Sequence, residues 1–127
     1  MQNLEHNLKE IIEIVGTDNL ITDTESLSFY STDIFETARE QAAAIVRPTN
    51  ADELIQVTQT CIKNEVPVIV RGGGASYTGG YLPVLKNTLI IDTKNLKAIE
   101  INEEDMYVTV EPGVTWLELY ETLKPLG

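Results

Sequence analysis

Residues 68–80 are the most informative part of the sequence and read Val68-Ile69-Val70-Arg71-Gly72-Gly73-Gly74-Ala75-Ser76-Tyr77-Thr78-Gly79-Gly80. A β-branched run, typical of a buried strand, leads into a loop with five glycines in nine positions. Because glycine has no Cβ and tolerates positive φ, other groups can come close to the backbone of this loop. Backbone N–H groups at the end of a strand, beside one arginine, can hold phosphate oxygens. The loop is therefore the candidate binding site around which we interpret the chain.

Two common phosphate-binding loops do not match this stretch. The dinucleotide fingerprint G-x-G-x-x-G fits Gly72 and Gly74, but Tyr77 stands where its third glycine should be. Gly74 and Gly79 have the spacing of a Walker A loop, but Gly80 stands at the lysine position. For the glycines alone, a connection that binds no ligand stays open as an alternative.

A third pattern fits better. The loop resembles the first FAD-binding loop of the vanillyl-alcohol oxidase / p-cresol methylhydroxylase family, whose FAD-binding domain is called PCMH-type. That family carries Arg-Gly-Gly-Gly-x-Ser-x-x-Gly-Gly directly after a strand, and residues 71–80 match this pattern. Three more segments resemble the family in the same order along the chain: 20–33 with Tyr30 and Asp33, 45–49, and 108–115.

The resemblance implies FAD as the cofactor and assigns no catalytic residue. Loop N–H groups would donate to the pyrophosphate, and the segment 112–114 would lie near the cofactor, at its adenine end. The cofactor-binding residues predicted in this way are Arg71, Gly72, Gly73, Gly74, Ala75, Ser76, Tyr77, Gly79, Gly80, Pro112, Gly113 and Val114. In some members a histidine in this loop is covalently attached to the flavin. Ala75 stands at that place, so we predict non-covalent FAD.

The composition is that of one ordinary globular core. The chain has 127 residues, of which 43% are hydrophobic and 23% charged. Its net charge of −11 argues against nucleic acid or an anionic membrane as a partner. Residues 48–100 hold five acidic and five basic side chains, whereas both flanking segments are acidic. A pyrophosphate site is better placed in this neutral middle.

Cysteine and histidine are too few for a disulfide or a metal cluster. Cys61 and His6 are the single residues of their kinds. Cys61 lies on an apolar helical stripe, so we expect a buried, inert thiol. No apolar run approaches the ~20 residues of a membrane helix. The acidic start of the chain lacks the order of a signal peptide, which predicts a cytoplasmic protein.

The hydrophobic pattern predicts an α+β fold. A small parallel βαβ layer is followed by the start of an antiparallel sheet, with helices on the outside. We expect strands at 42–46, 68–70 and 89–92, and a hairpin at 98–102 and 106–111 with one face on the core. The acidic turn 103–105 of that hairpin does not match a calcium loop.

Helices are expected where apolar residues recur at helical spacing. The first spans 4–15 and ends at Gly16, and the second runs from a capping box at Asn50 and Glu53 to about residue 64. The last helix follows a capping box at Thr115 and Glu118. Residues 17–44 show little periodicity. The apolar faces predicted for the second and last helices are Leu54, Val57, Cys61 and Ile62, and Trp116, Leu119, Tyr120 and Leu123.

We expect residues 1–127 to be the N-terminal part of a PCMH-type domain. Its parts would be a helical lead (1–41), the βαβ unit with the glycine loop (42–97), and a hairpin and helix (98–127). Family members are much longer, so we expect a piece of a longer protein, with a naturally short relative as the alternative. Tyr30 and Asp33 are interpreted here as a packed ring and a local cap.

Three functions follow from this reading. The first is the FAD-binding portion of a flavin-dependent oxidoreductase that acts on a 2-hydroxy acid or another alcohol, as glycolate and lactate oxidases do. Its small-molecule substrate would bind the full-length protein, and the isolated chain would be inactive. The second is a short non-catalytic domain for a nucleotide or phosphate. The third is a module that binds no ligand and dimerises through an exposed sheet edge.

Overall fold

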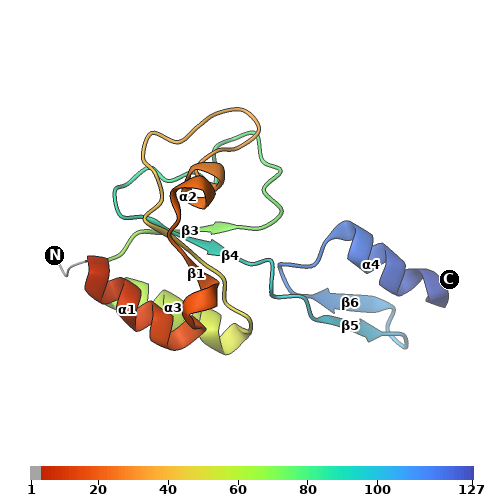
Figure 1. Ribbon diagram of the computed structural model, residues 1–127. Coiled ribbons are helices and arrows are strands. Elements are labelled where there is room, and N and C mark those ends of the chain that lie inside the picture. Colours follow the sequence, from red (N-terminus) through yellow and green to blue (C-terminus); the bar gives the residue numbers. More distant parts are fainter. Residues whose placement is uncertain (1–3) are drawn as a thin grey trace.

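The computed structural model, which describes residues 4–127, is built around a four-stranded sheet (Figure 1). Its strands are β1 (Leu20–Ile21), β2 (Ala44–Val46), β3 (Val68–Arg71) and β4 (Leu89–Asp92), in the order β1-β2-β4-β3. β4 is parallel to both β2 and β3, and β1 is antiparallel at one edge. The predicted parallel strands are confirmed, but β4 lies between β2 and β3. The carboxyl ends of all three therefore meet at one edge.

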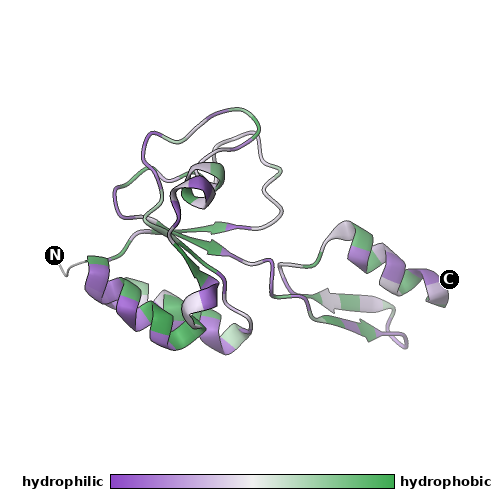
Figure 2. Cartoon of the chain, viewed as in Figure 1, coloured by the Kyte–Doolittle hydropathy of each residue, from purple (hydrophilic) through white to green (hydrophobic). Residues whose placement is uncertain are grey.

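Helices cover both faces of this sheet. α1 (Leu4–Val15) and α3 (Ala51–Lys63) lie on one face and α2 (Thr24–Tyr30) on the other (Figure 1). Successive strand side chains point to opposite faces. Ala44, Val46, Leu89 and Ile91 therefore pack with α1 and α3, whereas Ile45 and Ile90 pack toward α2. Burial on both faces explains the uninterrupted apolar runs of β2 and β4, which are green in Figure 2.

In α3 and β3, two residues that were predicted to be buried are exposed. Ile62 of α3 is 71% exposed, because Val57 and Cys61, four residues apart, face the sheet and Ile62 follows a further 100° around the helix. Val70 is 57% exposed, because β3 is an edge strand and the helices pack over the centre of the sheet. The predicted faces were therefore too wide at these two positions.

The segment without periodicity contains short elements. A 3₁₀ turn, η1 (Thr17–Asn19), leads into β1, and α2 has only seven residues. Asp23 caps α2 by accepting from the Ser26 N–H at 2.9 Å, in agreement with the cap chemistry predicted there. A helix of two turns is too short to show a periodic apolar stripe, which is why the sequence pattern missed it.

The capping box predicted at the start of α3 is half formed. The Asn50 side chain accepts from the Glu53 N–H at 2.9 Å, as expected. The Glu53 carboxylate accepts from the backbone N–H and the hydroxyl of Thr49, at 2.7 and 2.9 Å, and not from the Asn50 N–H. The helix is therefore capped, but its return contact falls one residue earlier than in a capping box.

The C-terminal part of the chain lies to one side of the sheet (Figure 1). It comprises β5 (Ile99–Asn102), β6 (Tyr107–Val110), α4 (Trp116–Leu123) and a 3₁₀ turn, η2 (Lys124–Leu126). β5 and β6 form the predicted antiparallel hairpin as a separate two-stranded sheet. The expectation that one face of the hairpin packs on the core is wrong, since Ile101 and Val110 on its apolar face are exposed and no residue of β5 or β6 is buried. The apolar face predicted for the last helix is not buried either, because Trp116 is 86% exposed and Tyr120 is 60% exposed.

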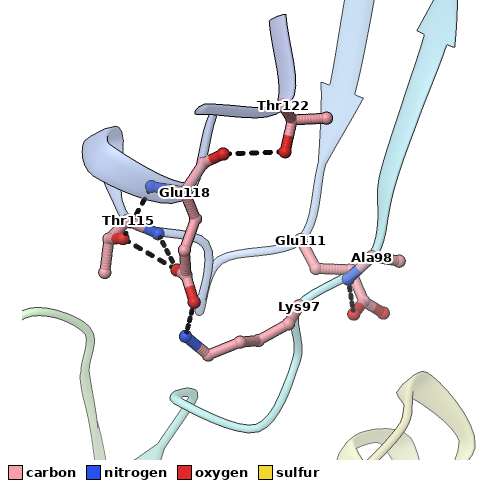
Figure 3. Close-up of polar contacts among 6 residues, drawn as sticks. All are labelled: Lys97, Ala98, Glu111, Thr115, Glu118 and Thr122. Carbon is pink, nitrogen blue, oxygen red and sulfur yellow. Dashed lines mark hydrogen bonds and ion pairs between the residues drawn. The ribbon is translucent and has the colours of Figure 1, made fainter. Parts of the chain in front are cut away.

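The capping box at the start of α4 is complete, as predicted (Figure 3). The Thr115 hydroxyl accepts from the Glu118 N–H at 3.2 Å, and the Glu118 carboxylate accepts from the Thr115 N–H at 2.7 Å. Lys97 also forms an ion pair with Glu118. The Lys97 contact, followed by the Thr115 contacts, lowers the pKa of Glu118 from 4.5 to about 2. This contact joins α4 to the segment that precedes β5.

Candidate functional site

The glycine loop begins at the carboxyl end of β3, the edge where the three parallel strands end together. Gly72 and Gly73 are exposed, and a Cβ added at Gly73 would meet no atom within 4 Å. Within residues 4–127, the backbone N–H groups of residues 72–76 donate to no other protein atom. Five successive donors without a protein acceptor therefore lie at the edge where ligands bind in open parallel sheets.

Three contacts hold the loop in place. Gly79, at a φ of 66°, donates its N–H to Asp33 Oδ2 at 2.9 Å. The Tyr81 hydroxyl donates to the Gly74 carbonyl oxygen at 2.8 Å, and Gly74 itself has a φ of 70°. The Ser76 hydroxyl accepts from the Thr78 N–H at 3.2 Å. The loop therefore has defined anchors at its middle and its end, and its N-terminal half keeps its donors free.

Asp33 does more than the local cap predicted for it. Its Oδ1 accepts from the N–H groups of Phe35 and Glu36, both at 2.7 Å, which is the predicted cap. Its Oδ2 reaches Gly79 across 46 positions of sequence. The Glu36 N–H, then those of Phe35 and Gly79, lower the pKa of Asp33. The carboxylate thus joins the turn after α2 to the end of the glycine loop.

The Arg71 side chain lies beneath the loop. Arg71 is 7% exposed, and its Nη1 donates to the Tyr30 carbonyl oxygen at 3.0 Å. Its guanidinium lies 4.7 Å from the ring centroids of both Tyr30 and Tyr81. A Cβ at Gly74 would fall only 2.7 Å from Arg71 Nη2, so the guanidinium touches the loop backbone from below. The guanidinium therefore contacts groups of the protein itself, namely Tyr30, Tyr81 and the loop backbone.

The second predicted segment, 112–114, lies beside the loop. A Cβ at Gly72 would be 4.0 Å from the Pro112 carbonyl oxygen. The Thr93 hydroxyl lies 3.3 Å from that oxygen and 3.4 Å from the Arg71 carbonyl oxygen. Gly113 donates its N–H to the Leu96 carbonyl oxygen at 2.8 Å. The structure thus brings together the two segments that the resemblance assigned to the cofactor.

Gly113 is required by backbone packing. A Cβ at this position would lie 2.2 Å from the Thr93 carbonyl oxygen and 2.6 Å from that of Leu96. The backbone would have to shift to admit a side chain at such distances, so glycine is strongly favoured here. The close approach holds the start of α4 against the turn that follows β4.

A polar network around the buried Asp92 at the same edge was not predicted from the sequence. The Tyr30 hydroxyl donates to Asp92 Oδ2 at 2.5 Å, and Arg47 Nε donates to the same oxygen at 3.0 Å. Arg47 Nη2 also donates to the Tyr30 hydroxyl at 2.9 Å. Burial, together with the hydrogen bond to Asp92, raises the pKa of Tyr30. The sequence signal was Asp92 itself, because an acid directly after a buried strand needs a partner.

The described residues contain no clustered metal ligands, and their one cysteine is buried. Within 4–127, no group of three or more His, Cys, Asp or Glu side chains is placed to hold a metal ion. Cys61 is fully buried, and burial raises its pKa to about 11, as expected of an inert thiol. Between residues 4 and 127, each helix is too short or too polar to span a bilayer.

Comparison with known proteins identifies the family. The model of the FAD-binding domain family matches residues 42–127, more than half of the chain, and the chain belongs to that family. The predicted cofactor, FAD, and the predicted PCMH-type resemblance are confirmed by this match and by the relatives below. The prediction that FAD is bound without a covalent bond stays a prediction.

Relatives and solved structures agree with this family. The chain is 26% identical over 119 residues to the glycolate oxidase subunit GlcD of Bacillus subtilis, covering 94% of the chain and 25% of the relative. It is 34% identical over 123 residues to the mitochondrial D-lactate dehydrogenase [cytochrome] of Arabidopsis thaliana, covering 94% and 21%. The structure of p-cresol methylhydroxylase superposes with a TM-score of 0.86 at 24% identity, covering 99% of the chain and 25% of that structure. The chain spans about a quarter of these proteins.

Proposed function

We propose that the chain is the N-terminal part of an FAD-binding domain, residues 1–127, whose loop 72–76 holds the FAD pyrophosphate through backbone N–H groups. The one observation that carries this proposal is the row of free donors at the carboxyl end of β3. Pyrophosphate oxygens are strong acceptors, and glycine lets them approach without steric hindrance. Ala75, which cannot bond to flavin carbon, supports a non-covalent cofactor.

The other predicted residues have supporting places in this proposal. Tyr77, Gly79 and Gly80 continue the loop, and the Ser76 hydroxyl can add a donor to it. Pro112, Gly113 and Val114 would border the cofactor site beside the loop, since the Pro112 carbonyl oxygen lies near Gly72.

We propose further that the longer protein oxidises a 2-hydroxy acid or another alcohol. This is supported by relatives named as a glycolate oxidase subunit and a D-lactate dehydrogenase. Bound FAD supplies hydride-accepting chemistry, and the protein contributes binding, orientation and electrostatics. Within residues 4–127 we assign no acid or base to the substrate, so the isolated chain is expected to be inactive.

Titration of FAD with the purified chain, and with the longer reading frame that contains it, tests the cofactor site. Flavin fluorescence should be quenched saturably. Gly73→Val places a β-branched side chain on the open face of the loop without an internal clash, and should weaken binding at least tenfold. Gln59→Val, at an exposed position of α3, is the matched control and should bind FAD as the wild type does. Equal affinity in wild type and Gly73→Val would sink the loop assignment.

The test also separates the alternatives. Quenching by FAD, ADP and pyrophosphate with equal affinity would favour a general nucleotide or phosphate domain. A dimer would form through an open edge such as β3, where Val70 is exposed. Sedimentation with and without FAD measures this, and a dimer unaffected by ligand would favour the interaction module.

A further inference from the structure

Tyr81 connects the glycine loop to the arginine that precedes it. Its hydroxyl donates to the Gly74 carbonyl oxygen at 2.8 Å. Its buried ring lies 4.7 Å from the Arg71 guanidinium. On its other side Arg71 meets the Tyr30 ring and donates to the Tyr30 carbonyl oxygen. One chain of contacts therefore runs from the end of α2 through Arg71 and Tyr81 to the middle of the loop.

Gly74 is the point at which the loop is clamped. Its carbonyl oxygen is bound by Tyr81, and the face where a Cβ would stand is covered by Arg71 Nη2 and Nε, at 2.7 and 2.9 Å from that Cβ position. Gly74 also has a positive φ, which the contacts on both sides maintain. On each side of this point lie the free N–H groups of the loop.

We infer that Arg71 and Tyr81 are positioning residues that fix the glycine loop in its binding conformation before FAD arrives. This inference rests on the proposed function, because it concerns the same loop. A run of glycines has many conformations. If the loop became ordered only when FAD binds, the conformational entropy lost would reduce the binding free energy. A loop ordered in advance by Tyr81 avoids that cost. On this inference Arg71 acts through its contacts with the loop, and not by supplying its charge to the phosphates.

Tyr81→Phe tests the clamp with the smallest possible change. The ring and its stacking on Arg71 remain, and only the hydrogen bond to Gly74 is lost. Loss of one such bond corresponds to about fivefold in affinity for FAD. Tyr107→Phe is the matched control, since Tyr107 is exposed and lies on β6, in the separate two-stranded sheet. Both variants should keep the thermal midpoint of the wild type within a few degrees.

Arg71→Lys separates positioning from direct phosphate binding. Lysine keeps the charge but loses the planar group that stacks on Tyr30 and Tyr81 and the fork that reaches the carbonyls of Tyr30 and Thr32. If Arg71 bound the phosphates through its charge, FAD affinity would be largely kept in this variant. A positioning residue would not, so we expect affinity to fall at least tenfold.

A second readout does not depend on FAD. NMR spectra and amide hydrogen exchange of residues 72–76, recorded without ligand, should show line broadening and faster exchange in Tyr81→Phe and Arg71→Lys. Wild-type spectra and wild-type FAD affinity in both variants would overturn the inference. If the wild type itself binds no FAD, the proposed function fails for this chain, and the loop spectra alone still decide the positioning role.

Discussion

The Tyr30 hydroxyl and the Asp92 carboxylate meet at 2.5 Å, although 62 positions separate them in the sequence. Asp92 is 2% exposed; its Oδ2 accepts from Tyr30 and Arg47, and its Oδ1 accepts from the Lys94 N–H at 3.1 Å. Tyr30 ends α2, Arg47 follows β2, and Asp92 ends β4. This small network therefore ties three elements together at the edge of the sheet that carries the glycine loop.

Asp92→Asn should destabilise the protein by about 3 kcal/mol, because breaking a buried pair leaves Arg47 without a compensating charge. Urea unfolding followed by circular dichroism measures this loss. Tyr30→Phe should cost less, about 1–2 kcal/mol, since it removes the hydrogen bonds with Asp92 and Arg47 but keeps the ion pair between them. Asp18→Asn, at an exposed position, is the control. A loss of less than 1 kcal/mol for Asp92→Asn would contradict the role given to the network.

Gly113→Ala should destabilise the chain by roughly 1–3 kcal/mol through overpacking. The added Cβ would lie 2.2 Å from the Thr93 carbonyl oxygen, and backbone must move to admit it. Gly73→Ala is the matched control, because nothing lies within 4 Å of its Cβ position. Thermal unfolding of the two variants should differ clearly, and identical midpoints would show that the turn after β4 yields easily.

FAD should be released completely when the loaded protein is denatured. Ala75 has no nucleophilic atom with which to bond the flavin. After precipitation with trichloroacetic acid, all flavin absorbance is expected in the supernatant. Fluorescence that stays with the protein band on a denaturing gel would reveal a covalent bond and refute this prediction.

Acid should open the start of α4 at an unusually low pH. The pKa of Glu118 is about 2 in the folded chain and near 4.5 when its contacts are absent. A depressed pKa stabilises the folded form above about 4.5, and this contribution fades as the pH falls toward 2. The Thr115 amide signal should therefore titrate with a midpoint near 2. Lys97→Met removes the largest cause and should raise that midpoint; an unchanged midpoint would contradict the assignment.

The sequence was sufficient for elements with a strong periodic pattern. α1 and α3 show apolar stripes, and β2 and β4 are apolar on both faces, so each was found close to its observed bounds. The order of the strands was not predictable, because the apolar runs of β3 and β4 look alike in sequence. Which of them takes the centre depends on packing against α1 and α3, a long-range property that no local pattern records.

The site was predictable where a motif marks it. The glycine loop and the segment 112–114 were found from the resemblance, and the structure places them side by side. Thr93, which lies between these segments, and Tyr81, which holds Gly74 within the loop, were missed because single polar side chains carry no periodic signal. The polar end of an apolar strand, as at Asp92, is the one feature that could have directed attention to this edge.

The central place of β4 determines how short a working fragment can be. A fragment ending at Gly80 would contain every residue of the glycine loop, yet β2 and β3 have no contact across the sheet until residues 89–92 lie between them. During synthesis the sheet likewise cannot close before this strand has left the ribosome. β4 is thus the last strand of this sheet in the sequence and the one that joins β2 to β3, so shortening the chain from its C-terminal side past β4 should abolish binding.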